Sequence, residues 1–319
     1  MTFKYTAMST ANNFVSTWKI LLYRLIIGVL MLCIGVSLVL PNIVPLIEEM
    51  EAARIFIVLE DIFNDVLSLE LNIKDCIDAL SGVFAEIVNI ILMSSQHLVR
   101  TYLALAITIL VWRFLSELAE IPFGIVLNAS MRMNANISFG LTYVRTLRLS
   151  VKYALARMLI AFPIDAVIVV VAALLFVGCA QIALLFAPFV SMLFIVISVS
   201  LRATLLFGWL PAIITDEMSI WRALGANFAA LKQNFWRIFS NAIMLVLLTI
   251  TGLLIVAVFT MGAGLLVIAP ASVVMFRCFA FISYYGISAK RYYADEDLIV
   301  TPVENEFSKR YNSMLRFDK

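Results

Sequence analysis

Long runs of apolar residues alternate with polar stretches along the whole chain. A bilayer span needs about 20 mostly apolar residues. The pattern predicts six such spans, at residues 19–41, 97–119, 154–177, 181–205, 238–261 and 264–288. Residues 178–181 separate the third span from the fourth, and residues 262–264 separate the fifth from the sixth. Links this short indicate two antiparallel helical hairpins.

The composition supports this pattern. Hydrophobic residues make up 63% of the 319 residues and charged residues 14%, whereas a soluble domain is about half apolar and a quarter charged. We therefore expect an all-α integral membrane protein. Its expected segments are an N-terminal tail with the first anchor (1–41), an outer helical module (42–97), a five-helix membrane bundle (98–289) and a C-terminal tail (290–319). The first apolar run is longer than a signal-peptide core and lacks a small-residue cleavage site, so we expect an uncleaved anchor.

Basic residues fall mainly on one side of the predicted spans. If the N-terminus is cytoplasmic, all but four of the 23 Lys and Arg residues lie in cytoplasmic segments or at the inner ends of spans. The exceptions are Arg54, Lys74 and Arg100 on the outer side, and Arg277 inside a span. Because cytoplasmic loops are enriched in Lys and Arg, we predict a multi-pass plasma-membrane protein with both termini in the cytoplasm.

Residues 42–97 form a strongly acidic outer segment. Its apolar residues recur at helical spacing, which predicts two amphipathic helices. The ten acidic residues are Glu48, Glu49, Glu51, Glu60, Asp61, Asp65, Glu70, Asp75, Asp78 and Glu86. Only Arg54 and Lys74 oppose them, which leaves a local balance of −8. Two interpretations remain open: a solvated acidic face, or a docking surface for a basic partner protein or for cations.

An internal repeat occupies the inner loops. Residues 137–157 match residues 217–237 at an offset of 80, so that Lys152 aligns with Lys232 and Arg157 with Arg237. Phe123-Gly124 upstream of the first copy is echoed by Phe207-Gly208. Two spans separate the copies, so both lie on the same side of the membrane and the repeat is parallel.

Each copy of the repeat predicts an amphipathic cytoplasmic joint. Polar and cationic residues share one face of each joint, and apolar residues the other. The candidate contacts to lipid headgroups are Arg145, Arg148, Lys152, Arg222 and Lys232. These helices either lie along the headgroup boundary, with their cations toward anionic lipid, or pack beneath the bundle.

The second copy and the residues before it carry a family resemblance. Its motifs are Phe207-Gly208-Trp209-Leu210-Pro211-Ala212-Ile213-Ile214, Trp221-Arg222-Ala223-Leu224 and Phe235-Trp236. This pattern resembles bacterial multi-pass proteins grouped with the membrane domain of glycerophosphodiester phosphodiesterases, over residues 100–290. The resemblance implies a six-helix bundle built from repeated hairpins. It implies little about activity, because the soluble phosphodiesterase domain of those enzymes has no counterpart in these residues.

Asp165 and Arg277 are charged residues inside predicted spans. Asp165 lies thirteen residues after Lys152, and Arg277 lies thirteen residues before Lys290, which is about 20 Å in each case at the helical rise. Equal depth and the cost of an unpaired charge in a bilayer predict an ion pair between them. Such a pair either fixes the packing of the bundle or belongs to a transport path. Pro163 is expected to kink the helix beside Asp165.

A second group of charges, Arg113, Glu117 and Glu120, lies near the inner end of the second span. Arg113 and Glu117 are one helical turn apart and can pair. We expect this cluster to stabilise the end of the helix at the membrane interface.

No catalytic, metal-binding or phosphate-loop motif is present in the sequence. His97 is the sole histidine, and the four cysteines are scattered, so we expect no metal or other cofactor. The net charge of +2 does not favour a nucleic-acid partner. Two functions remain: a non-enzymatic envelope scaffold or subunit of a membrane complex, and a transporter or channel with Asp165 and Arg277 on its pathway.

Overall fold

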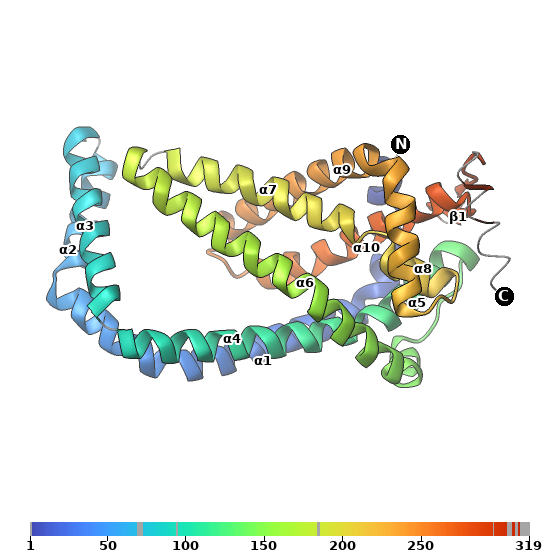
Figure 1. Ribbon diagram of the computed structural model, residues 1–319, viewed down its shortest axis with the longest axis horizontal. Helices are drawn as coiled ribbons and strands as arrows, with labels where there is room; N and C mark the ends of the chain where they lie inside the picture. Colours follow the sequence, from blue (N-terminus) through green and yellow to red (C-terminus); the bar gives the residue numbers. More distant parts are fainter. Residues whose placement is uncertain are drawn as a thin grey trace. The chain divides into compact units, whose positions relative to one another are not determined.

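The fold is almost entirely helical. A computed structural model describes residues 2–68, 73–93, 95–183, 186–295, 297–304, 308–309 and 312 (Figure 1). The helices are α1 (Thr2–Ala52), α2 (Ile55–Ser68), α3 (Ile73–Met93), α4 (Ser95–Leu118), α5 (Glu120–Met133), α6 (Phe139–Ala183), α7 (Ala187–Leu205), α8 (Trp209–Thr215), α9 (Ile220–Phe259) and α10 (Leu265–Ser288). Two short strands, β1 (Tyr292–Tyr293) and β2 (Ile299–Val300), pair antiparallel after α10.

Six helical segments of the described chain are long and apolar enough to cross a membrane. They are Thr17–Ala52, Val99–Met133, Phe139–Gln181, Ala187–Thr215, Ile220–Phe259 and Ala271–Ser288. Each overlaps one of the six apolar runs of the sequence. The prediction of a polytopic helical membrane protein is therefore confirmed.

The predicted amphipathic joints are not separate helices. Residues 137–157 and 217–237 form the first halves of α6 and α9, which continue without interruption for 45 and 40 residues. Pro163 lies inside α6 without ending it. At 1.5 Å per residue α6 is about 68 Å long, more than twice the hydrocarbon core of about 30 Å. A continuous helix forms because neither Gly nor a Pro-terminated loop separates the joint from the span.

Other boundaries also differ from the sequence pattern. The N-terminal segment is helical from Thr2 instead of forming a separate tail. Residues 178–181, expected as the turn between the third and fourth spans, are helical, because α6 continues to Ala183. The turn before the sixth span is where it was expected, and Gly262 adopts a φ of +87° there, a conformation that favours glycine.

The element order supports the internal repeat. A span, a short helix and a long helix follow one another in α4–α5–α6 and again in α7–α8–α9. The short helix α5 packs against α8, and the two lie side by side in Figure 1. Gly124 of α5 permits this close approach, because a side chain there would contact Ile214, Leu210 and Phe281.

The chain divides into two compact units. The first unit comprises Met1–Ile27, Phe114–Leu174 and Ser191–Lys319, and the second comprises Gly28–Arg113 and Leu175–Val190. The core of the first unit is built around α5, α8 and α10, with Phe123, Trp209 and Phe281 fully buried. In the second unit α2 packs against α3, and the outer half of α1 runs beside α4, where Gly35 lies against Thr108.

The C-terminal segment is part of the first unit's core, which the sequence pattern did not predict. Strand β1 packs against α5. The ring of Tyr292 stacks on Tyr285 of α10 and contacts Tyr5 of α1 edge-on. Burial raises the pKa of Tyr292 to about 12, so its hydroxyl stays neutral. The start of α1 and strand β1 therefore meet through aromatic contacts.

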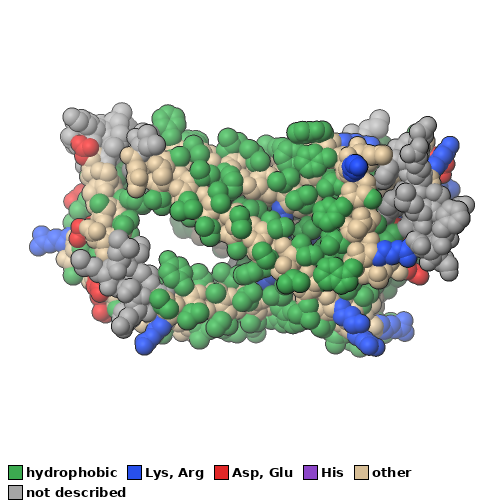
Figure 2. All heavy atoms as spheres, viewed as in Figure 1, with side chains coloured by type: hydrophobic (Ala, Val, Ile, Leu, Met, Phe, Trp, Pro, Cys, Tyr) green, Lys and Arg blue, Asp and Glu red, His purple; other side chains and the backbone are tan. Residues whose placement is uncertain are grey.

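Apolar side chains cover the outer faces of the long helices. Figure 2 shows hydrophobic side chains along the visible surfaces of α6 and α7. Leu159 is 71% exposed, Phe189 73% and Phe259 84%. Exposed apolar surface of this extent is typical of helices that face lipid.

Candidate functional site

Five charged side chains of the first unit form a cluster around the buried carboxylate of Glu120. We call this set the Glu120 cluster; it comprises Arg24, Glu117, Glu120, Arg157 and Arg277. Glu120 has a side chain that is only 3% exposed and receives three guanidinium groups. Arg24 forms an ion pair with it, Arg277 Nε lies 2.5 Å from Oε2, and Arg157 Nη1 lies 3.5 Å from Oε2. The cluster thereby joins α1, α5, α6 and α10.

Glu117 extends the cluster by one turn. Arg157 Nη1 donates a hydrogen bond of 2.6 Å to Glu117 Oε2, and both side chains are buried. Arg157 therefore bridges the two glutamates. Three guanidinium groups face two carboxylates, so the cluster holds one positive charge in excess. Each charge has an opposite neighbour, which a buried ion needs in order to offset its lost hydration.

The local sequence positions Glu120 at a break between helices. Helix α4 ends at Leu118, and α5 begins at Glu120 with Ala119 as its N-cap residue. Pro122 is near the start of α5, where the missing N–H costs no helical hydrogen bond. A carboxylate in the first turn of a helix also faces the positive end of the helix dipole. The arginines and the helix dipole thus stabilise the same charge.

The predicted pair of Asp165 and Arg277 is corrected by the structure, because each residue has a different partner. Asp165 of α6 forms an ion pair with Arg202 of α7, and Arg277 of α10 binds Glu120. Spacing along the sequence gives the depth of a residue along its helix, but it does not tell which helices are neighbours. Arg202 lies near the end of the fourth span and was therefore counted as an inner-end cation instead of a partner for Asp165.

Two members of the second predicted cluster are buried. Glu117 and Glu120 belong to the Glu120 cluster with arginines from α1, α6 and α10. The pairing of Arg113 with Glu117 and the interfacial role of the group stay predictions.

The predicted headgroup contacts are on the surface. Arg145, Arg148 and Lys152 are exposed on α6, and Arg222 and Lys232 are exposed on α9. Exposure is compatible with contact to lipid headgroups, and the contact itself stays a prediction.

The acidic outer module is helical, as expected. Helices α2 and α3 cover most of it, and Glu60, Asp61 and Asp78 are exposed. Glu70 and the side chains of Asp65 and Asp75 lie outside the described residues. The same is true of the Cys76 side chain, and Cys179 is a free cysteine.

A buried asparagine closes the break between α7 and α8. Asn227 of α9 donates from Nδ2 to the carbonyl of Leu205 at 2.6 Å and accepts from the N–H of Gly208 at 2.7 Å. These are backbone groups that the end of α7 leaves without helical partners. Trp209 adds a third bond, from Nε1 to the carbonyl of Ile220 at 2.8 Å. The motif around Trp209 is visible in the sequence, but the role of Asn227 is not.

A second polar group lies at the end of α10. Asp216 accepts hydrogen bonds from the Tyr284 hydroxyl and from the Lys290 ammonium group. In the same core, the Asn128 side chain of α5 accepts a hydrogen bond of 2.7 Å from the hydroxyl of Tyr285, the residue after Tyr284. These bonds tie α5, α8 and α10 together. The adjacent residues Tyr284 and Tyr285 carry hydroxyl groups in an apolar run, which could have indicated polar partners inside the core.

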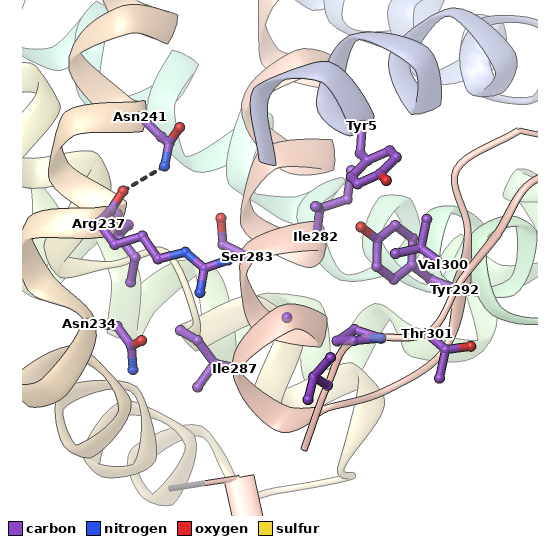
Figure 3. Close-up of a pocket in the computed structure, with 14 residues that line it drawn as sticks. Tyr5, Asn234, Arg237, Asn241, Ile282, Ser283, Ile287, Tyr292, Val300 and Thr301 are labelled. Carbon is purple, nitrogen blue, oxygen red and sulfur yellow. Dashed lines mark hydrogen bonds between the residues drawn. The ribbon is translucent and has the colours of Figure 1, made fainter. Parts of the chain in front are cut away.

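The first unit also contains a cavity of about 380 Å³. It lies between α9, α10, the start of α1 and the segment after β2. The lining residues are Tyr5, Asn234, Arg237, Ile238, Asn241, Ile282, Ser283, Gly286, Ile287, Tyr292, Val300, Thr301, Pro302 and Val303. None of the candidate site residues chosen from the sequence lines it. Arg237, which aligns with Arg157 in the repeat, is its cation (Figure 3).

Comparisons with family models, curated proteins and solved structures found no match to this chain. The resemblance to the membrane domain of glycerophosphodiester phosphodiesterases therefore stays a prediction. What the structure establishes is a polytopic helical membrane protein with six candidate spans.

Proposed function

We propose that this protein is a non-enzymatic membrane scaffold or a subunit of a membrane complex, with both termini in the cytoplasm. The Glu120 cluster is the observation that supports this proposal. A charge that takes part in transport must exchange its partners during the cycle. Glu120 has three arginine partners and almost no exposed surface, so each exchange would leave buried charges unpaired at a cost of several kcal/mol. A fixed bundle fits this arrangement better than a moving one.

The acidic outer module is the proposed docking surface. Exposed carboxylates such as Glu60 and Asp61 on α2 favour a partner with a basic surface, because complementary charge raises the rate and the specificity of association. The basic first halves of α6 and α9 would at the same time contact anionic lipid at the opposite end of the spans. In this proposal the protein links a partner outside the membrane to the inner lipid leaflet.

Transport is the second candidate, favoured by Asp165 and Arg202. This pair lies on two apolar helices, and its side chains are 25% and 21% exposed, more than those of Glu117 and Glu120. Pro163 two residues away removes a backbone hydrogen bond from α6. A partly accessible ion pair beside a helix irregularity is compatible with a gate. Arg277, the other residue proposed for the pathway, is held in the Glu120 cluster.

Copurification and flux measurements separate the two functions. If the scaffold proposal is right, a protein should copurify with the full chain from native membranes at a fixed ratio. The double variant Glu60→Lys/Asp61→Lys should lose that partner and keep its unfolding midpoint. The matched variant Arg145→Gln/Arg148→Gln, on the basic end, should keep it.

Proteoliposomes of the full chain provide the second measurement. We expect them to hold proton and potassium gradients as long as empty vesicles do. A flux that Asp165→Asn abolishes without changing the unfolding midpoint would contradict the scaffold proposal and support transport.

A further inference from the structure

Arg237 lines a cavity that can hold a small ligand. In Figure 3 its side chain extends from α9 toward α10, and Tyr5 and Tyr292 line the cavity from α1 and β1. Among the residues that the structure describes, no carboxylate forms an ion pair with Arg237, and no other charged side chain lines the cavity. The volume of about 380 Å³ lies within the range of about 300–1,000 Å³ that is usual for ligand sites.

The cavity is lined by both hydrogen-bonding and apolar side chains. Neutral polar side chains come from Asn234, Ser283 and Thr301, and apolar ones from Ile238 and Ile287. Asn241 donates to the Arg237 backbone carbonyl at 2.6 Å, and the Arg237 side chain is exposed, so its guanidinium donors can reach a ligand. One fixed positive charge among neutral donors suits a ligand that carries a single negative charge, since a guanidinium binds phosphate oxygens in a bidentate fashion.

The two copies of the repeat differ in the acidic residues that precede the aligned arginine. Arg157 in the first copy is neutralised by Glu117 and Glu120, which precede it at the junction of α4 and α5. The second copy aligns Arg237 with Arg157 but has no acidic residue from Ala187 to Thr215, across α7 and α8. The second copy thus keeps the cation and lacks its internal carboxylates.

Aromatic residues place the cavity at the level of lipid headgroups. Trp236, next to Arg237, is 76% exposed and forms a ring cluster with Phe235 and Phe239. Exposed tryptophan on a spanning helix is typical of the boundary between hydrocarbon and headgroups. Arg237 itself lies near the middle of α9, where its basic first half gives way to its apolar second half.

We propose that the Arg237 cavity binds the phosphodiester of an anionic phospholipid headgroup. The guanidinium group of Arg237 would contact the phosphate oxygens, and the neutral polar side chains would receive the glycerol hydroxyls. The apolar residues would face the first carbons of the acyl chains. Arg237 is exposed like the predicted headgroup contacts of α6 and α9, but it differs from them in lining this cavity.

A lipid titration followed by native mass spectrometry tests this site. The full chain in detergent micelles is titrated with phosphatidylglycerol and, separately, with diacylglycerol of the same acyl chains, which lacks the phosphate. We expect saturable binding of phosphatidylglycerol only. Arg237→Gln should raise its Kd about tenfold or more, because a charge-assisted contact of this kind is worth at least that factor.

Two further variants make the result specific. Arg148→Gln removes the same charge from an exposed position on α6 and should leave the saturable component unchanged. Arg237→Lys keeps the charge and should retain most of the binding, even if Arg237→Gln also lowers the unfolding midpoint. An equal loss in Arg148→Gln and Arg237→Gln would mean diffuse surface attraction and would overturn the proposal.

Inorganic phosphate is the competing source of the same chemistry. Phosphate added at millimolar concentration should not displace phosphatidylglycerol from the wild-type protein. Displacement by phosphate, with equal sensitivity to Arg237→Gln, would assign the cavity to a soluble phosphate and overturn the lipid proposal.

Discussion

Arg157 of α6 and Glu117 at the end of α4 form a buried ion pair across forty residues of sequence, with Nη1 2.6 Å from Oε2. Because Arg157 also approaches Glu120, the pair couples the junction of α4 and α5 to a helix of 45 residues. The orientation of α6 against the core thus depends on charge pairing as well as on apolar packing.

Removal of either partner should destabilise the bundle more than removal of both. Glu117→Gln or Arg157→Met is expected to cost about 3–5 kcal/mol, since each leaves a buried charge with fewer partners. The double variant should cost less than either single variant, because it leaves no charge of this pair behind. Unfolding in mixed micelles of mild detergent and dodecyl sulfate measures all three. Lys152→Met, at an exposed position of α6, serves as the control and should change stability by less than about 0.5 kcal/mol.

Exchange of charges should identify the partner of Asp165. Asp165→Arg alone is expected to destabilise by about 3 kcal/mol, because it breaks the ion pair and places two positive charges side by side. Combining it with Arg202→Asp should restore most of that loss, because the two ends of the pair are exchanged. Combining it with Arg277→Asp should not. Rescue by the substitution at position 277 would bring back the pairing expected from the sequence.

Asn227 should be sensitive to truncation because it serves two backbone groups. Asn227→Ala leaves the Leu205 carbonyl and the Gly208 N–H buried without their partner, so a loss of about 2–4 kcal/mol is expected. The same substitution at Asn241, whose amide donates only within α9, should cost less than about 1 kcal/mol. Similar losses at both positions would rule out a special role for the joint between α7 and α8.

Cysteine labelling in intact cells tests the orientation. In a background without native cysteines, Asn136→Cys, exposed between α5 and α6, should resist an impermeant thiol reagent until the membrane is opened. Glu60→Cys on α2 should react at once. The expectation follows from the distribution of Lys and Arg. Reversed labelling of these two positions would invert the topology and move the acidic module to the cytoplasm.

The spans could be predicted from the sequence because burial in lipid imposes a simple pattern, an apolar run of fixed minimum length. The hairpin at Gly262 could also be predicted, since glycine marks a turn with positive φ. The ends of α6 and α9 could not. An amphipathic segment and the apolar segment that follows it both have high helix propensity. This propensity does not tell whether the two form one continuous helix or two helices joined by a loop.

The partners of the charged residues could not be predicted from the hydrophobic pattern. Spacing from Lys152 and Lys290 gives depth along a helix but not rotation about its axis or the identity of its neighbours. Glu120 was recognised as a charge at the end of a span, yet its burial depends on Arg24, 96 residues away, and on Arg277. Asn227 was missed because an amide in a polar half-helix gives no sign that it will face a helix end.

The order in which the Glu120 cluster is synthesised has a consequence for membrane insertion. Arg24 leaves the ribosome 96 residues before its carboxylate partner, a delay of about 5–20 s at ordinary rates of translation. During that interval Arg24 lies in the first span without its carboxylate partner. Arg24 is close to Lys19 at the end of this span, so its side chain can extend toward the lipid headgroups. Arg277 arrives last, on the sixth span. The nascent chain therefore inserts its early spans before the residues of the Glu120 cluster that will bind them together have been synthesised.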